Sequence, residues 1–240
     1  MRVSTLDNTI SKQIYTRGIF EPAELSYIRK TVKPGMVAMD IGANIGVHTL
    51  TLAHCVGPKG FVHAFEPSAA FKRLEVNIKM NGFRDRVSLQ RSAIGAKNGT
   101  LKLIRCRPGF EAFTSISTPM KPEYCEGEPF EVAVETLDHY AMMNNIQHID
   151  FMKIDTEGSE RDIFRGAAKL LSARAIRHMM FEVNETCLRN CGTSSKDLIA
   201  DIKQAGFILK MLDKDATLLP CPDEPKGDWV TVVAELNNSL

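Results

Sequence analysis

Two acidic residues, with a glycine-containing turn after the first, form the part of this chain best suited to binding a ligand. Asp40 ends an apolar run and is followed by Gly42-Ala-Asn-Ile-Gly46, and Glu66 ends the next apolar run. Glycine lets the chain turn sharply and lets a ligand approach the backbone. A carboxylate at the end of the second of two parallel strands suits ribose hydroxyls. The pattern therefore predicts a pocket for a nucleoside-like ligand.

The spacing within the turn indicates which nucleotide fits. A dinucleotide fingerprint reads Gly-x-Gly-x-x-Gly, whereas Asn44 occupies the place of the middle glycine here. This side chain disfavours a pyrophosphate against the backbone, and the acid at Asp40 favours a ligand with a positively charged end. S-adenosylmethionine offers a sulfonium and an ammonium near the turn, and ribose hydroxyls for Glu66. The alternative is a plain strand-turn-helix crossover whose glycines serve packing only.

Three motifs resemble those of the FkbM-type S-adenosylmethionine-dependent methyltransferases. They are Asp40-Ile-Gly-Ala-Asn-Ile-Gly-Val-His-Thr49, then Phe65-Glu66-Pro67, and then the most family-specific one, residues 149–160; residues 132–138 also match. The resemblance covers residues 15–235 and implies methyl transfer, mostly to hydroxyls of sugars, glycolipids or polyketide-type natural products. It also places the adenine edge near Ser92, for which a turn serine is the alternative. The expected cofactor-binding residues are Asp40, Gly42, Asn44, Gly46, Thr49, Glu66, Ser92 and Asp155.

Methyl transfer from a sulfonium requires the acceptor oxygen, the methyl carbon and the sulfur in line, and a hydroxyl acceptor also needs a base. Asp155 and Glu157 follow a buried strand and precede a helix, and Lys153 shares a strand face with Asp155. We predict Asp155 or Glu157 as the acceptor-side base, with Lys153 keeping Asp155 ionised. The helix N-terminus favours Glu157 as an anion and lowers its basicity. The alternative is that both acids serve only as caps and ion-pair partners of the helix.

Glu182 and Asn184 stand at the end of the next buried strand. We predict that Glu182 lines the acceptor pocket and contributes to catalysis. Together with Asp155, these residues are three oxygen donors on adjacent strand ends, which could hold a magnesium ion. We predict no metal, because the FkbM-like pattern does not usually imply one, and keep this set as the alternative. His48 could face the methyl group, with a polar helix position as the alternative.

Residues 105–128 contain several prolines and glycines and lack periodicity. A loop of this length inside a compact domain is commonly functional, so we predict an acceptor loop here. Its residues Phe110, Phe113, Thr114 and Ser115 combine apolar surface with hydroxyls suited to a sugar ring. The alternative is an ordinary surface loop. His139 is a further candidate base near this segment.

The composition limits the classes of partner and location. The chain has 240 residues, 44% of them hydrophobic, and a net charge of +1, so no basic field predicts a nucleic-acid partner. It shows no signal-peptide core and no apolar run of membrane-spanning length, which predicts a cytoplasmic protein without a membrane span. Six cysteines without a CxxC pair favour free thiols. The sequence carries no indication of an oligomeric state.

Strand-like and helix-like segments alternate along the chain. Strands are expected at 37–41, 61–65, 87–92, 100–104, 130–134, 149–154, 179–183, 207–211 and 229–236. Helices are expected from Pro22, from Val47, over 68–80, from Gly158 and from Ser194. This order predicts an α/β fold with a doubly wound, mostly parallel seven-stranded sheet and an antiparallel C-terminal edge strand. Residues 1–34 would be a helical lead-in and residues 35–240 the methyltransferase domain.

The sequence therefore predicts an S-adenosylmethionine-dependent O-methyltransferase that acts on a hydroxyl of a sugar, glycolipid, polysaccharide or other natural product. Its partner would be a small-molecule or glycan acceptor. An NAD(P)-dependent oxidoreductase is one alternative, against which the turn with Asn44 argues. A non-catalytic cofactor-binding module is another, against which the intact acids at 155, 157 and 182 argue.

Overall fold

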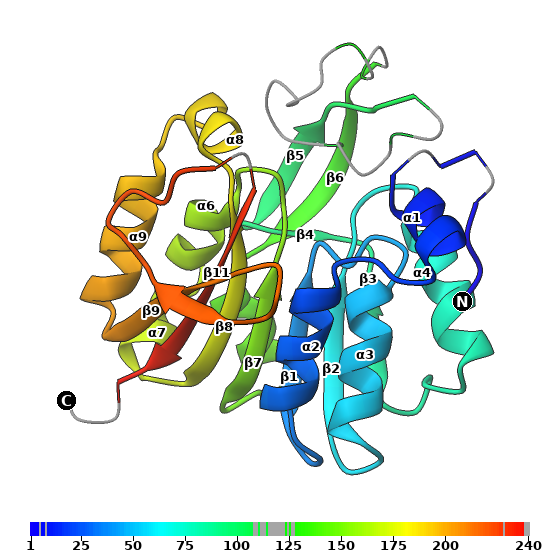
Figure 1. Cartoon of the computed structure of the whole chain (residues 1–240), viewed down its shortest axis with the longest axis horizontal. Helices are drawn as coiled ribbons and strands as arrows, with labels where there is room; N and C mark the ends of the chain where they lie inside the picture. Colours follow the sequence, from blue (N-terminus) through cyan, green and yellow to red (C-terminus); the bar gives the residue numbers. More distant parts are fainter. Residues whose placement is uncertain are drawn as a thin grey trace.

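A computed structural model describes residues 1–4, 6–7, 9–107, 110, 114, 123, 125, 128–227 and 229–237. A central sheet has helices on both faces, and a smaller second sheet projects from one end of it (Figure 1). The strands of the central sheet are β1 (Val37–Ile41), β2 (Phe61–Phe65), β3 (Val87–Gln90), β7 (Ile149–Ile154), β8 (Ile176–Val183), β9 (Phe207–Leu212), β10 (Leu218–Pro220) and β11 (Val230–Leu236). The second sheet consists of β4 (Ala93–Ile94), β5 (Gly99–Leu103) and β6 (Phe130–Glu135). The helices are α1 (Ile10–Arg17), α2 (Pro22–Thr31), α3 (Val47–Val56), α4 (Phe71–Met80), α5 (Leu137–Met143), α6 (Glu160–Arg165), α7 (Ala168–Ser172), α8 (Glu185–Asn190) and α9 (Ser195–Gln204).

The central sheet confirms the predicted α/β class but differs in two details. Its order is β10-β9-β11-β8-β7-β1-β2-β3, with β3, β2, β1, β7 and β8 parallel, so it has eight strands rather than seven. The last strand is antiparallel, as predicted, but β11 lies between β8 and β9, and β10 forms the edge. Consecutive buried residues Val232, Val233 and Ala234 explain this placement, because a strand that is apolar on both faces belongs inside a sheet.

Alternation along the strands divides the core into two layers. Met39 and Ile41 face the layer that contains α5, α6 and α9, whereas Ala38 faces the layer of α2, α3 and α4. The register pairs Asp40 of β1 with Lys153 of β7. Because side chains at paired positions point to the same face of a sheet, both residues lie on the side covered by α2 and α3.

The helices follow most of the expected start signals. Pro22 is the first residue of α2, and the Ser194 side chain accepts a hydrogen bond from the Asp197 N–H at the start of α9. The helix expected from Gly158 is instead divided into α6 and α7 at Gly166. A Cβ atom at Gly166 would lie 2.1 Å from the Gly95 carbonyl oxygen, so the glycine permits a close backbone contact here.

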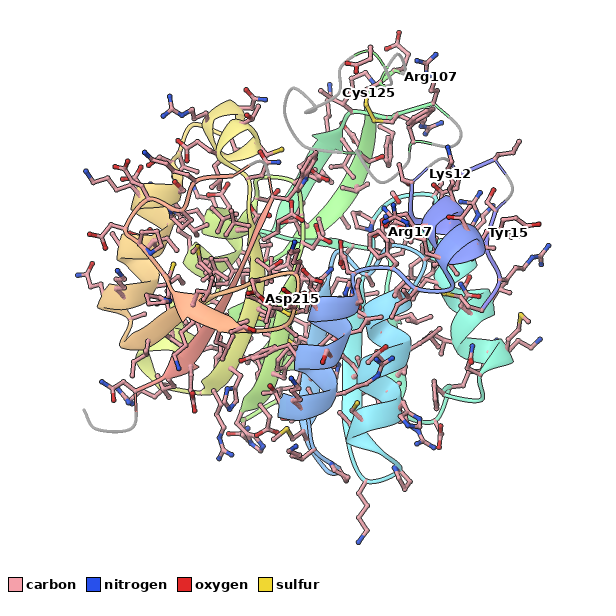
Figure 2. The ribbon with its side chains drawn as sticks, viewed as in Figure 1. Lys12, Tyr15, Arg17, Arg107, Cys125 and Asp215 are labelled. Carbon is pink, nitrogen blue, oxygen red and sulfur yellow. A yellow bond between two sulfur atoms is a disulfide. The ribbon has the colours of Figure 1, made fainter. Side chains whose placement is uncertain are left out.

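The second sheet brings two cysteines together. Because β5 and β6 are antiparallel and pair Leu103 with Phe130, the residues beyond these strand ends are neighbours. Cys106 and Cys125 form a disulfide at this end, away from the central sheet (Figure 2). The prediction of free thiols is therefore wrong for this pair, whose separation of 19 residues carries no recognisable motif.

Asn77 of α4 connects the N-terminal segment to the turn after β1. Its side chain is fully buried, and its Nδ2 donates to the carbonyl oxygens of Ile45 at 2.8 Å and of Arg2 at 3.1 Å. Its Oδ1 accepts from the Arg2 N–H at 2.5 Å. One amide side chain therefore satisfies three backbone groups next to the predicted cofactor turn.

We expect Asn77→Ala to lower the free energy of unfolding by about 1–3 kcal/mol, because buried backbone groups lose their partners. Asn81→Ala is the matched control, since the Asn81 Nδ2 donates only to the Asn77 carbonyl at the exposed end of the same helix. The control should cost less than about 0.5 kcal/mol. Urea unfolding measures both changes, and equal losses would contradict the assigned role.

Candidate functional site

A cavity of about 990 Å³ opens at the carboxyl ends of β1, β2, β7 and β8. Its walls also include α1 residues such as Gln13 and second-sheet residues such as Leu101 and Leu103. This volume is in the range of small-molecule and cofactor sites, and the carboxyl edge of a parallel sheet is where such sites occur. The cavity therefore lies where the sequence predicts ligand binding.

The turn after β1 contributes backbone to the cavity wall. Gly42 and Asn44 line the cavity and have φ values of 84° and 48°. A Cβ atom at Gly42 would lie 1.8 Å from the Asp155 carbonyl oxygen, so only glycine allows the ends of β1 and β7 to approach this closely. Gly46, with φ of 95°, precedes α3 and does not line the cavity.

Glu66 is placed as predicted, at the cavity wall after β2. Its Oε2 accepts from the Asn44 N–H and its Oε1 from the Ser68 N–H, each at 2.8 Å. Burial raises the pKa of Glu66, and these hydrogen bonds oppose the shift. Each oxygen retains a second lone pair, so the carboxyl can still accept hydrogen bonds from a bound diol.

The structure places Asp40 and Thr49, which the sequence predicts as cofactor contacts, away from the cavity wall. Both side chains are fully buried below the turn and do not line the cavity. The Thr49 hydroxyl donates to Asp40 Oδ2 at 2.5 Å, whereas Asp40 Oδ1 has no hydrogen-bond partner in the described structure. The charge of Asp40 reaches Lys153, whose pKa it helps to raise.

Ser92 lines the cavity beyond β3. Its hydroxyl donates to Glu135 Oε1 at 3.2 Å, so it is held in place by the second sheet. Apolar side chains of Phe65, Ile94 and Val134 line the same region. A polar edge beside an apolar slot is suited to a planar base such as adenine.

The predicted pair of Lys153 and Asp155 is present, with Nζ and Oδ2 2.9 Å apart. Asp155 and Lys153 both line the cavity, although only 4% of Lys153 is exposed. Burial acts to lower the pKa of Lys153, but the charges of Asp155, Asp40 and Glu21 outweigh it and raise this pKa. Lys153 is therefore held as a cation that balances Asp155.

Glu157 differs from the prediction that the helix N-terminus would favour its anion. Burial, followed by the charge of Asp155, raises the pKa of Glu157 to about 8. Glu157 precedes α6 with φ of 55°, and its Oε2 accepts from the Cys187 thiol at 3.3 Å. The short helix does not offset the loss of water around this carboxyl. Glu160, rather than Glu157, accepts the hydrogen bonds at the start of this helix: its Oε1 accepts from the Thr156 N–H and hydroxyl and from the Gly158 N–H.

Glu182 lines the cavity as predicted, but the alternative metal set does not form there. Asn184 does not line the cavity, and its side-chain oxygen accepts from the Cys187 N–H at the start of α8. No group of three His, Cys, Asp or Glu side chains suited to a metal occurs among the described residues. Burial and then the charges of Asp155 and Glu157 raise the pKa of Glu182 well above its ordinary value.

The sequence analysis missed two acids contributed by the N-terminal segment. Glu21, before α2, lies with its Oε2 3.2 Å from His48 Nε2, and both residues line the cavity. Glu24 lines it too and accepts a hydrogen bond from the Thr231 hydroxyl at 2.7 Å. Their proximity to Pro22, which starts α2, was the available signal, because residues around a helix start often face a site at the sheet edge.

The candidate acceptor loop falls mostly outside the described residues, including Phe113 and Ser115. Thr114 lines the cavity. The Arg107 guanidinium lies over the Phe110 ring, with its central carbon 5.6 Å from the ring centroid. Phe110 does not line the cavity. His139 is also absent from the cavity wall and lies 3.8 Å from Glu135.

The sheet and the glycine turn define a Rossmann-like α/β protein with an acid-lined cavity at the carboxyl edge of its sheet. Residues 40–209 match the methyltransferase FkbM domain, and the chain belongs to this family. It is 28% identical over 204 residues to the 31-O-demethyl-FK506 methyltransferase FkbM of Streptomyces tacrolimicus, with 74% of this chain and 76% of that protein covered.

Solved structures agree with this fold. One is an S-adenosylmethionine-dependent O-methyltransferase from Thermotoga maritima, with 16% identity, a TM-score of 0.53, and 97% of this chain and 71% of that chain covered. Another is an rRNA methylase from Streptococcus thermophilus, with 11% identity, a TM-score of 0.52, and coverage of 89% and 95%. At these identities the likeness shows the fold alone.

Membership of the family means that the protein is a methyltransferase, and it implies S-adenosylmethionine as the methyl donor. The family favours this assignment over the oxidoreductase alternative. No helix in the described part of the chain is long and apolar enough to cross a membrane. Cytoplasmic location and the exclusion of nucleic acid stay predictions.

The raised pKa of Glu157 predicts a pH-dependent stability. The folded protein keeps this proton up to about pH 8, whereas the unfolded chain releases it near the ordinary pKa of 4.5. The stabilising contribution of Glu157 is therefore complete below pH 4.5 and lost as the pH rises through 8. Glu157→Gln keeps the uncharged form, so its stability relative to the wild type should rise across this window and level off above it.

Urea unfolding at a series of pH values measures this difference. Glu75→Gln, on the exposed side of α4, is the control and should differ from the wild type by a constant amount. A constant difference for Glu157→Gln as well would show that the Glu157 proton is not retained on folding.

Proposed function

We propose that the protein transfers a methyl group from S-adenosylmethionine to a hydroxyl of a sugar, glycolipid, polysaccharide or other natural product. The observation that carries this proposal is the single cavity shared by the Gly42 turn, Glu66 and the acids at the ends of β7 and β8. A donor and an acceptor can therefore meet in one cavity. The named activity of the Streptomyces relative, a 31-O-demethyl-FK506 methyltransferase, supports an oxygen acceptor.

The residues along the cavity suit the parts of the donor. Glu66 can accept hydrogen bonds from the ribose, while Ser92, Ile94 and Phe65 can hold the adenine. Gly42 and Asn44 present backbone toward the methionine end. When bound, S-adenosylmethionine supplies an electrophilic methyl group, and the protein must hold the acceptor oxygen in line with it.

The acids on the other side of the cavity can receive the acceptor's proton. Asp155 forms an ion pair with Lys153 at 2.9 Å and lines the cavity beside the other acids. Glu157 and Glu182 have raised pKa values and are stronger bases whenever they are ionised. A hydroxyl acceptor fits this set, because one of these acids can take up the proton that the hydroxyl loses.

Glu66→Gln should weaken the binding of S-adenosylhomocysteine by about tenfold or more, because hydrogen bonds to a charged group contribute roughly 1.5–3 kcal/mol. The glutamine NH2 group that replaces one carboxylate oxygen would also point a donor at a backbone N–H, which is itself a donor. Calorimetric titration gives the affinities, and circular dichroism checks the fold. The exposed Glu75→Gln is the control. Unchanged affinity in Glu66→Gln would remove this residue from the site.

Methyl transfer itself can be tested with S-adenosylmethionine that carries a deuterated methyl group. We expect neutral glycosides and cyclic diols to yield deuterated methyl ethers, detected by mass spectrometry and located by NMR. Matched deoxy compounds lacking the methylated hydroxyl should give no product. Label found only on nitrogen or a carboxylate would reject the oxygen assignment. Binding of the donor without transfer to any acceptor would instead favour the cofactor-binding module.

A further inference from the structure

The acceptor side of the cavity holds more carboxyl groups than cations. Asp155, Glu157 and Glu182 come from the ends of β7 and β8, and Glu21 faces them from the segment before α2. Their mutual repulsion is expressed in the pKa of Glu182, which burial and then the charges of Asp155, Glu157, Glu160 and Glu21 all raise. The other acids therefore lie close enough to Glu182 to oppose its ionisation.

The cations along the described cavity wall do not cancel this charge. Lys153 is already paired with Asp155 and lies beside the buried Asp40. Arg165 forms an ion pair with Asp162 at 2.9 Å, on α6. Lys97 belongs to the connection between β4 and β5, on the second-sheet side. A cationic ligand would relieve the repulsion that these residues leave.

A second observation points to a ligand at the same place. His48 is only 5% exposed and lines the cavity, yet its Nε2 has no aligned hydrogen-bond partner in the described structure. Glu21 Oε2 lies 3.2 Å away but outside hydrogen-bond geometry. A buried polar atom in this state is costly unless a ligand or water completes it.

We propose that Asp155, Glu157, Glu182 and Glu21 form the counter-charge for the donor's sulfonium, so that the cavity binds the cationic donor more tightly than its neutral product and releases a proton when the donor binds. This inference rests on the proposed use of S-adenosylmethionine. It adds that the positive charge of the bound donor favours the ionised form of a cluster carboxyl, which can then act as the base.

The charge balance of the transfer supports this arrangement. The bond between sulfur and the methyl carbon breaks, its electron pair stays on sulfur, and a bond from the acceptor oxygen to the methyl carbon forms. The sulfonium charge disappears as the acceptor hydroxyl loses its proton. A carboxylate of the cluster, ionised because the cation was present, takes up that proton as the cation vanishes. The cavity thus keeps the same net charge throughout, which avoids an uncompensated charge in a buried site.

The titratable groups around the cluster determine which residue releases a proton when the donor binds. The cluster acids face His48 on α3, Lys153 on β7 and Cys187 on α8. Burial and then the charge of Glu157 raise the pKa of Cys187, so this thiol stays protonated. Lys153 stays charged, because its pKa is raised. Burial and neighbouring charges raise the pKa values of Glu157 and Glu182, so these are the cluster acids that hold a proton to release.

The test compares three ligands by calorimetric titration of the full chain near pH 7. They are S-adenosylmethionine, its thioether product S-adenosylhomocysteine, and sinefungin, in which an amine-bearing carbon replaces the sulfonium. Repeating each titration in phosphate and in Tris, whose ionisation enthalpies differ, gives the number of protons released. The two cationic ligands should bind at least tenfold more tightly than the thioether, and each should release more protons than the thioether does.

Two variants and one control locate the effect. Glu182→Gln and Glu157→Gln should each reduce the affinity difference to a few-fold and lower the proton release. Glu24→Gln removes a carboxyl from the same cavity wall, where Glu24 is held by Thr231, and should keep both properties. An equal effect in Glu24→Gln would overturn the assignment to the cluster.

The outcomes separate this inference from the proposed function. Equal affinities for the donor and the thioether, or equal proton release, would overturn the counter-charge while leaving the methyltransferase assignment intact. Failure of all three ligands to bind would reject the proposed cofactor and this inference with it.

Discussion

The site depends on one buried cation, Lys153, which is placed between two carboxylates on neighbouring strands. The register sets Lys153 of β7 opposite Asp40 of β1, and its Nζ contacts Asp155 two residues further on. Removing one partner from such a buried arrangement typically costs about 3–5 kcal/mol, because the remaining charge loses its compensation. The pairing therefore ties the strand that starts the glycine turn to the strand that delivers the acids. Gly42 makes the same junction possible from the backbone side.

Parallel topology explains why so many acids meet. In a sheet of this kind the carboxyl ends of β1, β2, β7 and β8 lie at one edge, so the acids at the ends of β2, β7 and β8 reach the same cavity. Burial then changes what these acids can do. Burial raises the pKa of all three acids; two backbone N–H groups oppose the shift at Glu66, whereas the charges of other carboxyls add to it at Glu157 and Glu182. Similar positions in the sequence thus give one hydrogen-bond acceptor and two proton carriers.

The sequence predicted the elements that depend on local patterns. The strand before Gly42, the cap at Ser194 and the Lys153–Asp155 pair follow from periodicity and spacing, and all three are present. Prediction from the sequence failed for features that depend on contacts between segments far apart in the chain. The position of β11 inside the sheet and the bond between Cys106 and Cys125 both depend on pairing between strands far apart in the chain. The same applies to Glu21, which reaches the cavity only because α2 packs across α3.

Asp40 shows how a correct motif can suggest the wrong contact. An acid just before a glycine turn matches a ligand-binding pattern, yet alternation points its side chain into the layer beneath α3, where Thr49 donates to it. Its charge still reaches the cavity through Lys153, whose pKa it helps to raise. Lys153 carries a single positive charge, which its ion pair with Asp155 uses. The other acids of the cavity therefore have no cation from this lysine. The first acid of the motif therefore shapes the charge that a ligand meets without touching that ligand.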